Sequence, residues 1–471
     1  MADGAAPLSA AGRRRDRLSA LSDDLLHKII TQHLPVTEAA QTAALARRWR
    51  NLWSSTPLVL RDADLPEPAR DAVVPRVLAE HPGHFRTVVL HDCRLASLDR
   101  ELPGWPLVLA AKDTQKLDLL PNQVDPFPCI PEGILRCGTL KELSLGYWDL
   151  SRGANISLPH LRSLTLIMVV ISDQDLEHLV AACPALKTLH LSSTGPAHVR
   201  LRSPSLHCAL VGLWMVEDFA VVDAPLLERL ILFLPPRDDG VVVRVKIGGH
   251  AANLRVLGHL NTRAHRLQIG DIVIQRNTMA STSAVIPSVK ILAVTVNFDV
   301  LSEVRTLASF LRCFPNVDTL HIESAVHGFS VAANEVPSVE LHARFWEEVS
   351  LVECLRSHVR KMVIHKFRGD QNEFQFLKFV AMNAKELQSL HVVLQQENTS
   401  STDKMNETED NLQSLWFRTG ISGVLLVRPT VGFTSILQKA TDLTSDDPFR
   451  FECMVTSPYA FMIGPLLLGN R

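Results

Sequence analysis

The first apolar pattern along the chain has the spacing of an amphipathic helix within residues 16–35. The positions that recur at this spacing are Leu25, Leu26, Ile29, Ile30 and His33. Ser22 stands where an N-cap hydroxyl accepts a backbone hydrogen bond, and Asp23 and Asp24 place negative charge at the positive end of the helix dipole. Because proline cannot continue a helix, Pro35 is expected to end it.

A second helical pattern follows from Thr37, with Glu38 in its first turn, and leads into the stretch LARRWRNLW. One face of that stretch carries Leu45, Trp49, Leu52 and Trp53. A helical unit this short buries too little apolar surface to be stable alone. Its leucines and tryptophans are therefore expected to pack on the rest of the chain or to dock on another protein.

From residue 140 onward the motif Leu-x-x-Leu-x-Leu recurs. Clear copies begin at Leu140, Leu161, Leu186 and Leu227, and weaker or degenerate copies begin at Leu206, Leu254, Val289, Val317 and Leu387. The first intervals between copies are 21, 25, 20 and 21 residues, and later intervals lengthen to 27 and 35. Intervals of about 20 to 29 residues are typical of leucine-rich repeats.

Each copy predicts a short strand whose alternate residues point into a core shared with the neighbouring repeats. Amphipathic helices are expected before some strands, one starting at Ser172 and another at Ser302. Their inner faces carry Leu176, Leu179, Val180 and Cys183 in the first and Val304, Leu307, Leu311 and Phe314 in the second. The predicted fold class is α/β: a short N-terminal helical domain followed by a curved solenoid with parallel strands inside and helices outside.

The outward positions of the predicted strands are polar, mixed in charge and not basic. They are Glu142, Ser144, Ser163, Thr165, Thr188, His190, Arg229, Thr319 and His321. Any one of these residues is explained as a solvated strand position. As a set on the concave side of a solenoid, they are our candidate surface for binding a target protein, which the sequence does not identify.

Composition and charge narrow the class of function. Hydrophobic residues make up 46% of the 471 positions and charged residues 21%, which excludes an intrinsically disordered chain. The formal net charge of -2 gives no basic excess for nucleic acid, although the arginines within 13–17 form either a nuclear address or a solvated tail. The longest apolar runs fall short of the roughly 18 to 20 residues of a membrane span. We therefore expect no nucleic-acid partner, no membrane, and residence in the nucleus, the cytoplasm or both.

Motifs for catalysis or cofactor binding are missing from the sequence. Neither the glycine-rich phosphate loops, nor HExxH, nor the G-x-S-x-G elbow is present. The eight cysteines are scattered without a CxxC pair, as expected of small buried hydrophobic residues. We expect no catalytic residue, no cofactor and no metal, and no residue indicates a small-molecule co-ligand.

The stretch 16–53, DRLSALSDDLLHKIITQHLPVTEAAQTAALARRWRNLW, resembles the F-box. The positions that match its motif are Leu21, Leu25, Leu26, Ile29, Leu34, Pro35, Leu45, Arg48, Trp49 and Trp53. At Ser22 the family usually has a proline, which opens the helix and also touches the adaptor. The resemblance implies that these residues, with Ser22 included, bind a Skp-type adaptor and through it a cullin, within a ubiquitin ligase.

The stretch 352–394 is similar to the FBD domain, which follows F-box and leucine-rich segments in many plant proteins. Cys354, Phe367, Gly369, Glu373 and Leu387 match that pattern. A strand at 359–364, a turn at Gly369, a helix at 372–384 and a closing strand are expected there. The resemblance supplies no biochemical role, but such a segment would cover the last hydrophobic face of a solenoid.

These patterns divide the chain into six segments. We expect a disordered tail (1–14), an F-box helical domain (15–60), leucine-rich repeats (70–345), an FBD domain (346–394), a flexible polar loop (395–411) and C-terminal strands packed on the FBD end (412–471). The loop is expected because residues 395–411 are polar, acidic and free of aromatic side chains.

Together, the resemblances imply a non-catalytic substrate-recognition subunit of an SCF-type E3 ubiquitin ligase. Its F-box would dock on the adaptor while its repeats bind a target protein. The alternative is a non-degradative interaction scaffold whose F-box-like unit does not bind the adaptor productively, and Ser22 keeps that hypothesis open.

Overall fold

The structure of the chain is a computed structural model that divides into two compact units. It describes residue 18 and residues 20–94, 101–120, 127–151, 155–193, 195–213, 215–233, 241–248, 251–275, 284–325, 339–349, 352–394, 402–419, 421–427 and 439–449. Unit 1 comprises residues 1–124 and 131–140, and unit 2 comprises residues 125–130 and 141–471. The expected tail at 1–14 and the basic run at 13–17 lie outside the described residues.

Unit 1 begins with the helices α1 (Asp23–His33), α2 (Val36–Thr42) and α3 (Arg47–Ser55). Ser22 caps α1 as predicted, because its hydroxyl accepts a hydrogen bond from the Leu25 amide at 3.4 Å. Leu26 and Ile30, one turn apart on α1, are buried, as are Trp49 and Leu52 on α3. The segment that was expected to run on from Thr37 is therefore two helices, separated by a turn at 43–46.

The same unit continues into three parallel strands, β1 (Leu58–Arg61), β2 (Phe85–Leu90) and β3 (Lys116–Leu119). The remaining elements of unit 1 are η1 (Asp62–Asp64), η2 (Glu67–Ala69), α4 (Arg70–Glu80), η4 (Leu102–Gly104), α5 (Trp105–Ala111) and η5 (Glu132–Arg136). The buried Asp62 carboxylate accepts hydrogen bonds from the amides of Asp92 and Cys93 at 2.7 and 2.8 Å, which ties β1 to the end of β2. The helices thus share one compact unit with the first strands.

Unit 2 is built on a parallel sheet in which each repeat contributes one strand, as the motif predicted. In order, its strands are β4 (Glu142–Gly146), β5 (Ser163–Ile167), β6 (Thr188–Ser193), β8 (Cys208–Leu213), β10 (Arg229–Leu232), β12 (Val256–Asn261), β15 (Ile291–Val296), β16 (Thr319–Ser324), β17 (Lys361–Phe367), β18 (Ser389–Leu394) and β19 (Ser422–Val427). Equivalent motif positions lie in register, for example Leu143 beside Leu164 and Leu164 beside Leu189. The leucines of the motif therefore stack into one continuous core.

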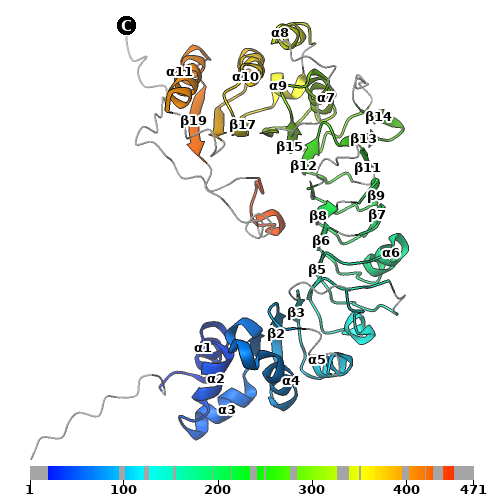
Figure 1. Cartoon of the computed structure of the whole chain (residues 1–471), viewed down its shortest axis with the longest axis vertical. Coiled ribbons are helices and arrows are strands. Elements are labelled where there is room, and N and C mark those ends of the chain that lie inside the picture. The colour runs from blue at the N-terminus through cyan, green and yellow to red at the C-terminus, as the bar shows by residue number, and fades with distance from the viewer. Residues whose placement is uncertain are drawn as a thin grey trace, which may run out of the picture. The chain divides into compact units, whose positions relative to one another are not determined.

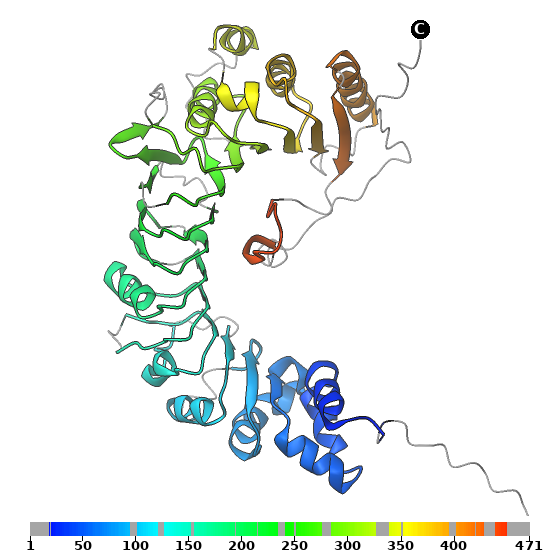
Figure 2. The same ribbon diagram turned by 180° about the vertical axis from the view of Figure 1, so that it is seen from behind.

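On one side of this sheet lie helices and, between α6 and α7, a second sheet (Figures 1 and 2). The second sheet consists of β7 (His198–Arg202), β9 (Asp218–Asp223), β11 (Val243–Ile247), β13 (His265–Ile269) and the antiparallel β14 (Ile272–Ile274). The helices are α6 (Asp173–Ala181), α7 (Leu301–Arg312), α8 (Val339–Glu348), α9 (Glu353–Ser357), α10 (Gln371–Asn383) and α11 (Thr402–Thr419). The helices predicted from Ser172 and Ser302 are α6 and α7, and in the middle repeats between them strands take the place of helices.

The C-terminal third has the predicted strand–turn–helix–strand order in β17, α10 and β18. The flexible loop predicted at 395–411 is wrong from residue 402 onward, because α11 begins there. Thr408 and Leu412 of α11 are buried, and the Trp416 ring lies directly against the backbone of Gly423 on β19. These contacts stabilise a helix whose polar composition indicated a loop.

The last segment, predicted as strands on the FBD end, has two parts. Strand β19 does add to β18 at that end of the sheet. Residues 439–449, by contrast, lie against the middle of the sheet, on the face opposite the helices and the second sheet (Figures 1 and 2). We call this the inner face. The prediction for 412–471 is wrong for this segment, and residues 450–471 lie outside the described part of the chain.

Candidate functional site

The first candidate surface belongs to the N-terminal helices α1–α3. Of the residues predicted to bind an adaptor, Leu26 and Trp49 are buried and hold the helices together. Half-buried are Leu21, Ile29, Leu34, Pro35, Arg48 and Trp53, and exposed are Ser22, Leu25 and Leu45. Leu25 is 48% exposed and Leu45 is 69% exposed, so the apolar stripe predicted on α1 has a buried side and a side that faces outward.

A further exposed leucine, Leu18, precedes α1 and is 57% exposed. Its carbonyl accepts a hydrogen bond from the Leu21 amide at 3.0 Å, which places Leu18 in a turn just before the helix. Leu18 lies outside the helical spacing, so the apolar pattern of the helix does not include it. Exposed leucines are apolar surface that a partner can cover.

Arg48 fixes the start of α1 against α3. Its guanidinium donates to the Asp23 carboxylate at 2.6 and 2.9 Å and to the Leu21 carbonyl at 2.6 Å. The predicted adaptor residue Arg48 is thus engaged within the helical unit, where it orients the Leu21–Leu25 turn. Trp53 is engaged as well, because its ring meets His81 edge-on at a centroid distance of 4.8 Å.

The second candidate surface is the inner face of unit 2, where the structure divides the nine predicted residues. Glu142 is exposed; Ser144, Ser163, Thr165, Thr188 and Thr319 are half-buried; His190, Arg229 and His321 are buried. Arg229 is 5% exposed and His321 is 1% exposed, although both were predicted to face solvent. Both are covered by residues 439–449.

Arg229, on β10, binds the main chain of that segment. Its Nη1 donates to the Asp442 carbonyl at 2.7 Å, and its Nη2 donates to the carbonyls of Leu443, at 3.4 Å, and Ser445. A buried guanidinium requires such acceptors, because its desolvation is costly without them. One side chain of the sheet thus holds three carbonyls of the segment.

The carboxylate of Asp447 is held by His321 on β16 and Lys361 on β17. His321 Nε2 lies 3.2 Å from Asp447 Oδ2, and Lys361 Nζ donates to the same oxygen at 3.0 Å. His365 lies behind His321, with its Nε2 3.0 Å from His321 Nδ1. Burial by itself would raise the pKa of Asp447, but the hydrogen bonds and positive charge of His321 and Lys361 outweigh it and hold this pKa well below its ordinary value.

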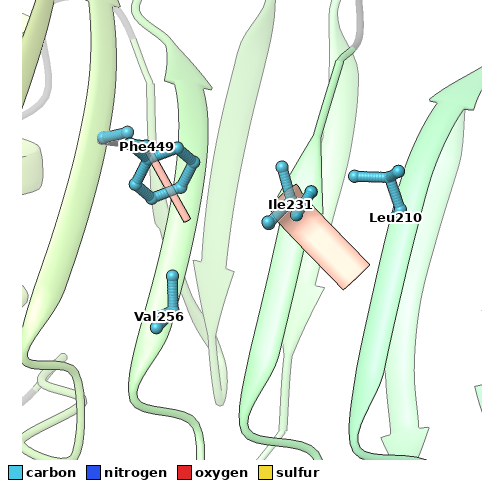
Figure 3. Packing of buried hydrophobic residues seen from close by; sticks show 6 residues of the cluster. Leu210, Ile231, Val256 and Phe449 are labelled. Atoms are coloured by element: carbon cyan, nitrogen blue, oxygen red, sulfur yellow. The ribbon is translucent and has the colours of Figure 1, made fainter. Parts of the chain in front are cut away.

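The ring of Phe449 fills an apolar site on the same face. It packs with Leu210, Ile231, Val256 and Ala293 of four neighbouring strands, together with Ala440 of the segment (Figure 3). The rings of His259 and His321 lie 5.0 and 5.4 Å from it. Gly258 makes room for it, because a Cβ atom at residue 258 would come within 3.0 Å of the Phe449 ring.

Sequence reasoning missed Lys361, Asp447 and Phe449, yet the sequence held a signal. At β8 (CALVGL) and β10 (RLIL), apolar residues occupy the outward as well as the inward positions. A strand that is apolar on both faces is covered on both faces.

The FBD segment holds a buried carboxylate that connects three elements. Glu373 of α10 accepts hydrogen bonds from the Ser324 hydroxyl at 2.5 Å and from the amides of Arg368 and Asp370 at 3.0 Å each. Burial is the main influence on its pKa, which is raised above the ordinary value. With the Asp370 carboxylate, Glu373 also forms a capping box at the start of α10. The residues that match the FBD pattern here are structural.

Two kinds of site are absent from the described residues. Within this part of the chain, no three His, Cys, Asp or Glu side chains converge as metal ligands would. Likewise, no described helix is both long and apolar enough to cross a membrane.

Two family models match the chain beyond the N-terminal helices. One, described as "FBD-associated F-box protein At5g56370, LRR repeats", matches residues 102–322, and the other, described as "FBD", matches residues 347–392. The second match spans β17, α10 and most of β18.

Curated relatives from Arabidopsis thaliana carry related names. F-box/LRR-repeat protein 13 is 31% identical over 233 residues, which are 46% of this chain and 51% of that protein. Putative F-box/FBD/LRR-repeat protein At5g22670 is 30% identical over 242 residues, 48% of this chain and 53% of that protein. At about 30% identity, the chain therefore spans about half the length of the relatives it matches.

Longer matches have lower identity. Putative FBD-associated F-box protein At5g22720 is 25% identical over 430 residues, which are 80% of this chain and 88% of that protein. The sheet of one strand per repeat and the FBD segment agree with these matches, so the chain is similar to the F-box/FBD/LRR-repeat proteins in its repeats and in its FBD segment.

Proposed function

We propose that this chain is the substrate-recognition subunit of a cullin-based ubiquitin ligase. Its N-terminal helices dock on a Skp-type adaptor, and the repeats of unit 2 bind a target protein. The similarity to proteins that are named for an F-box supports this proposal.

The main support for the proposal is that the helical unit has exposed leucines on its outward side. Leu18, Leu25 and Leu45 are exposed, while the buried residues Leu26 and Trp49 fix the helices that present them. Exposed leucines on a rigid support are expected where a protein partner excludes water.

The chain's contribution to ubiquitin transfer is proximity. Holding a target near a recruited conjugating enzyme replaces an encounter in solution by a step within one complex. No catalytic residue is required of the chain itself, and we propose that it acts in the nucleus, the cytoplasm or both.

A second candidate function is a non-degradative scaffold whose helical unit does not bind the adaptor productively. The observation that favours it is Ser22, which stands where the family usually has proline. Binding of the intact chain to a purified adaptor decides between the two proposals.

We expect Leu25→Asp and Leu45→Asp to reduce adaptor binding at least about tenfold, because each places a charge where an apolar contact should form. The measurement is a titration of the full chain with a purified Skp-type adaptor. Both positions are exposed, so the free energy of unfolding should change by about 0.5 kcal/mol or less.

The matched control is Leu107→Asp on α5, in the same unit, where the leucine is 79% exposed and lies outside the F-box stretch. This variant should bind the adaptor like the unmodified chain. If the unmodified chain fails to bind while remaining folded, the scaffold function is favoured. Equal binding by the Leu25→Asp variant would show that the surface is wrongly assigned.

We expect Ser22→Pro to bind the adaptor as tightly as the unmodified chain or more tightly. Ser22 has a φ of -66°, the value that proline imposes, and only a long 3.4 Å capping bond is lost. The same titration, with a thermal melt beside it, tests this expectation. A clear loss of affinity without a loss of stability would mean that the serine itself contacts the adaptor.

A further inference from the structure

The strands and helices of the repeats do not cover the inner face of the sheet. Each of the strands β8 to β17 that carry it is hydrogen-bonded to a neighbouring strand on both sides, so the ladder is complete without residues 439–449. The leucine core of the repeats lies on the other face. The segment is thus an addition to a finished sheet rather than a layer on which the sheet depends.

Chemically, the covered face is a mixture of apolar and cationic groups. Its apolar part is the cluster around Ile231 and Ala293, and its cationic groups are Arg229 and Lys361, with His321 between them in the stack of strands. The segment that covers it, KATDLTSDDPF, carries three aspartates and one lysine. Opposite charge and a single aromatic anchor make the two surfaces complementary.

The inner face binds residues 439–449 through three separate sets of contacts, as a peptide-binding site binds its peptide. Arg229 binds main-chain carbonyls, His321 and Lys361 bind a carboxylate, and the apolar cluster receives the Phe449 ring. The carboxylate precedes the ring by two residues. Main-chain hydrogen bonds provide affinity in such sites, and pockets for particular side chains provide specificity.

The segment's own aspartates form hydrogen bonds within it, in addition to its contacts with the sheet. The Asp442 carboxylate accepts from the amide and hydroxyl of Thr444 at 2.9 and 2.6 Å, and Asp447 Oδ1 accepts from the Phe449 amide at 3.1 Å. Such Asx turns reduce the entropy that is lost on binding. Asp446 and Thr444 remain exposed, as in a bound peptide whose other side faces solvent.

We propose that the inner face is the target-binding site, that residues 439–449 occupy it in the free chain, and that a target displaces them with an acidic peptide carrying a carboxylate two residues before an aromatic ring. The proposal rests on the proposed function only in calling the displacing peptide a target. Because the occupant is tethered, it competes at an effective concentration on the order of millimolar. A peptide that binds weakly, or that lacks one of these sets of contacts, therefore does not displace the segment.

The first test uses Cys208, which lies under the segment with its thiol 3.6 Å from the Ala440 carbonyl oxygen. In the full chain, Asp447→Lys combined with Phe449→Ala should release the segment and speed alkylation of Cys208 by N-ethylmaleimide at least about tenfold. Mass spectrometry resolves the individual cysteines. The matched control is Asp446→Lys, an identical change of charge at the exposed neighbouring residue, and it should leave the rate unchanged.

Other cysteines serve as internal references. Cys129 is exposed and should react at the same rate in all variants, whereas Cys313 and Cys354 are buried in the repeat core and should stay protected. If Cys208 stays protected in the release variant while the references behave as stated, the proposal is overturned. Reaction of Cys208, Cys313 and Cys354 together would show unfolding, and the second test then decides.

The second test adds a fluorescein-labelled peptide of sequence KATDLTSDDPF and follows its anisotropy. It should bind the release variant at least about tenfold more tightly than the unmodified chain, and a peptide with asparagine for the residue-447 aspartate and alanine for the residue-449 phenylalanine should not bind. Lys361→Glu in the receptor should also abolish binding. For the unmodified chain, we expect saturable binding at peptide concentrations above the effective concentration of the tether, and its absence there would overturn the proposal.

Neither test contains the adaptor. Failure of peptide binding would therefore leave adaptor docking by the helical unit intact. Failure of adaptor docking would leave the peptide site intact, as part of a scaffold.

Discussion

Replacing Glu373 with alanine is expected to destabilise the FBD end of unit 2 by about 3 to 5 kcal/mol, the usual cost of removing one partner from a buried charged network. The substitution leaves the Ser324 hydroxyl and the amides of Arg368 and Asp370 without their acceptor in a site closed to water. It also removes half of the capping box of α10. Hydrogen exchange of β17 and α10, resolved by mass spectrometry, measures the loss locally.

Glu386→Ala is the matched control for this experiment, because Glu386 is exposed just beyond the end of α10. Its effect should stay within about 0.5 kcal/mol. If the two alanine variants exchange at the same rate, Glu373 does not connect β16, β17 and α10 in the way the hydrogen bonds indicate.

Mild acid is expected to destabilise both units, because three buried histidines are held neutral. Burial, and then the charge of Lys112, lowers the pKa of His81 in unit 1 to about 4. In unit 2, burial lowers the pKa of His190 to about 4 and that of His265 to about 3. Below the ordinary histidine pKa of 6.5, these histidines are protonated in the unfolded chain but stay neutral in the folded chain. The free energy of unfolding therefore decreases as the pH is lowered from 6.5 to the lowered pKa.

At pH 5 each of these residues contributes a loss of about 2 kcal/mol, which in unit 2 is offset in part by Glu373, because its raised pKa favours the folded state as the pH falls. Urea midpoints at pH 7 and pH 5, resolved between the units by hydrogen exchange, measure it. His265→Asn retains an acceptor for the Asn261 amide and should remove its share of the loss, with His160→Asn at an exposed position as the control. Equal midpoints at the two pH values would contradict the assignment.

Local patterns predicted the elements of the repeats well, because a leucine motif specifies both the strand and its register. Ser172 caps α6 as its position indicated, and the strand–turn–helix order around Gly369 is present. Gly369 has a φ of 79°, and a Cβ atom there would lie 2.4 Å from the Thr408 hydroxyl of α11. The positive φ and the nearby Thr408 side chain thus explain why residue 369 is a glycine, whereas the sequence alone indicated only a turn there.

What the sequence could not supply depends on contacts between distant segments. Arg229 and His321 were predicted as solvated positions, since nothing in their own repeats shows that residues 439–449 cover them. Similarly, α11 forms where Trp416 meets Gly423, a packing contact that composition does not encode. In the helical unit, the spacing of Leu25 and Leu26 identified an apolar stripe, but only packing divides it into a buried and an exposed side.

Residues 439–449 also affect how unit 2 can unfold. In a repeat array each repeat contacts only its neighbours, so the two ends can fray independently and a local break need not spread. This segment touches β8 through Cys208, β10 through Arg229 and β17 through Lys361, and so connects β17 with two strands to which it is not hydrogen-bonded. The connection couples the opening of repeats that would otherwise melt one by one, and its release would turn one cooperative transition into several.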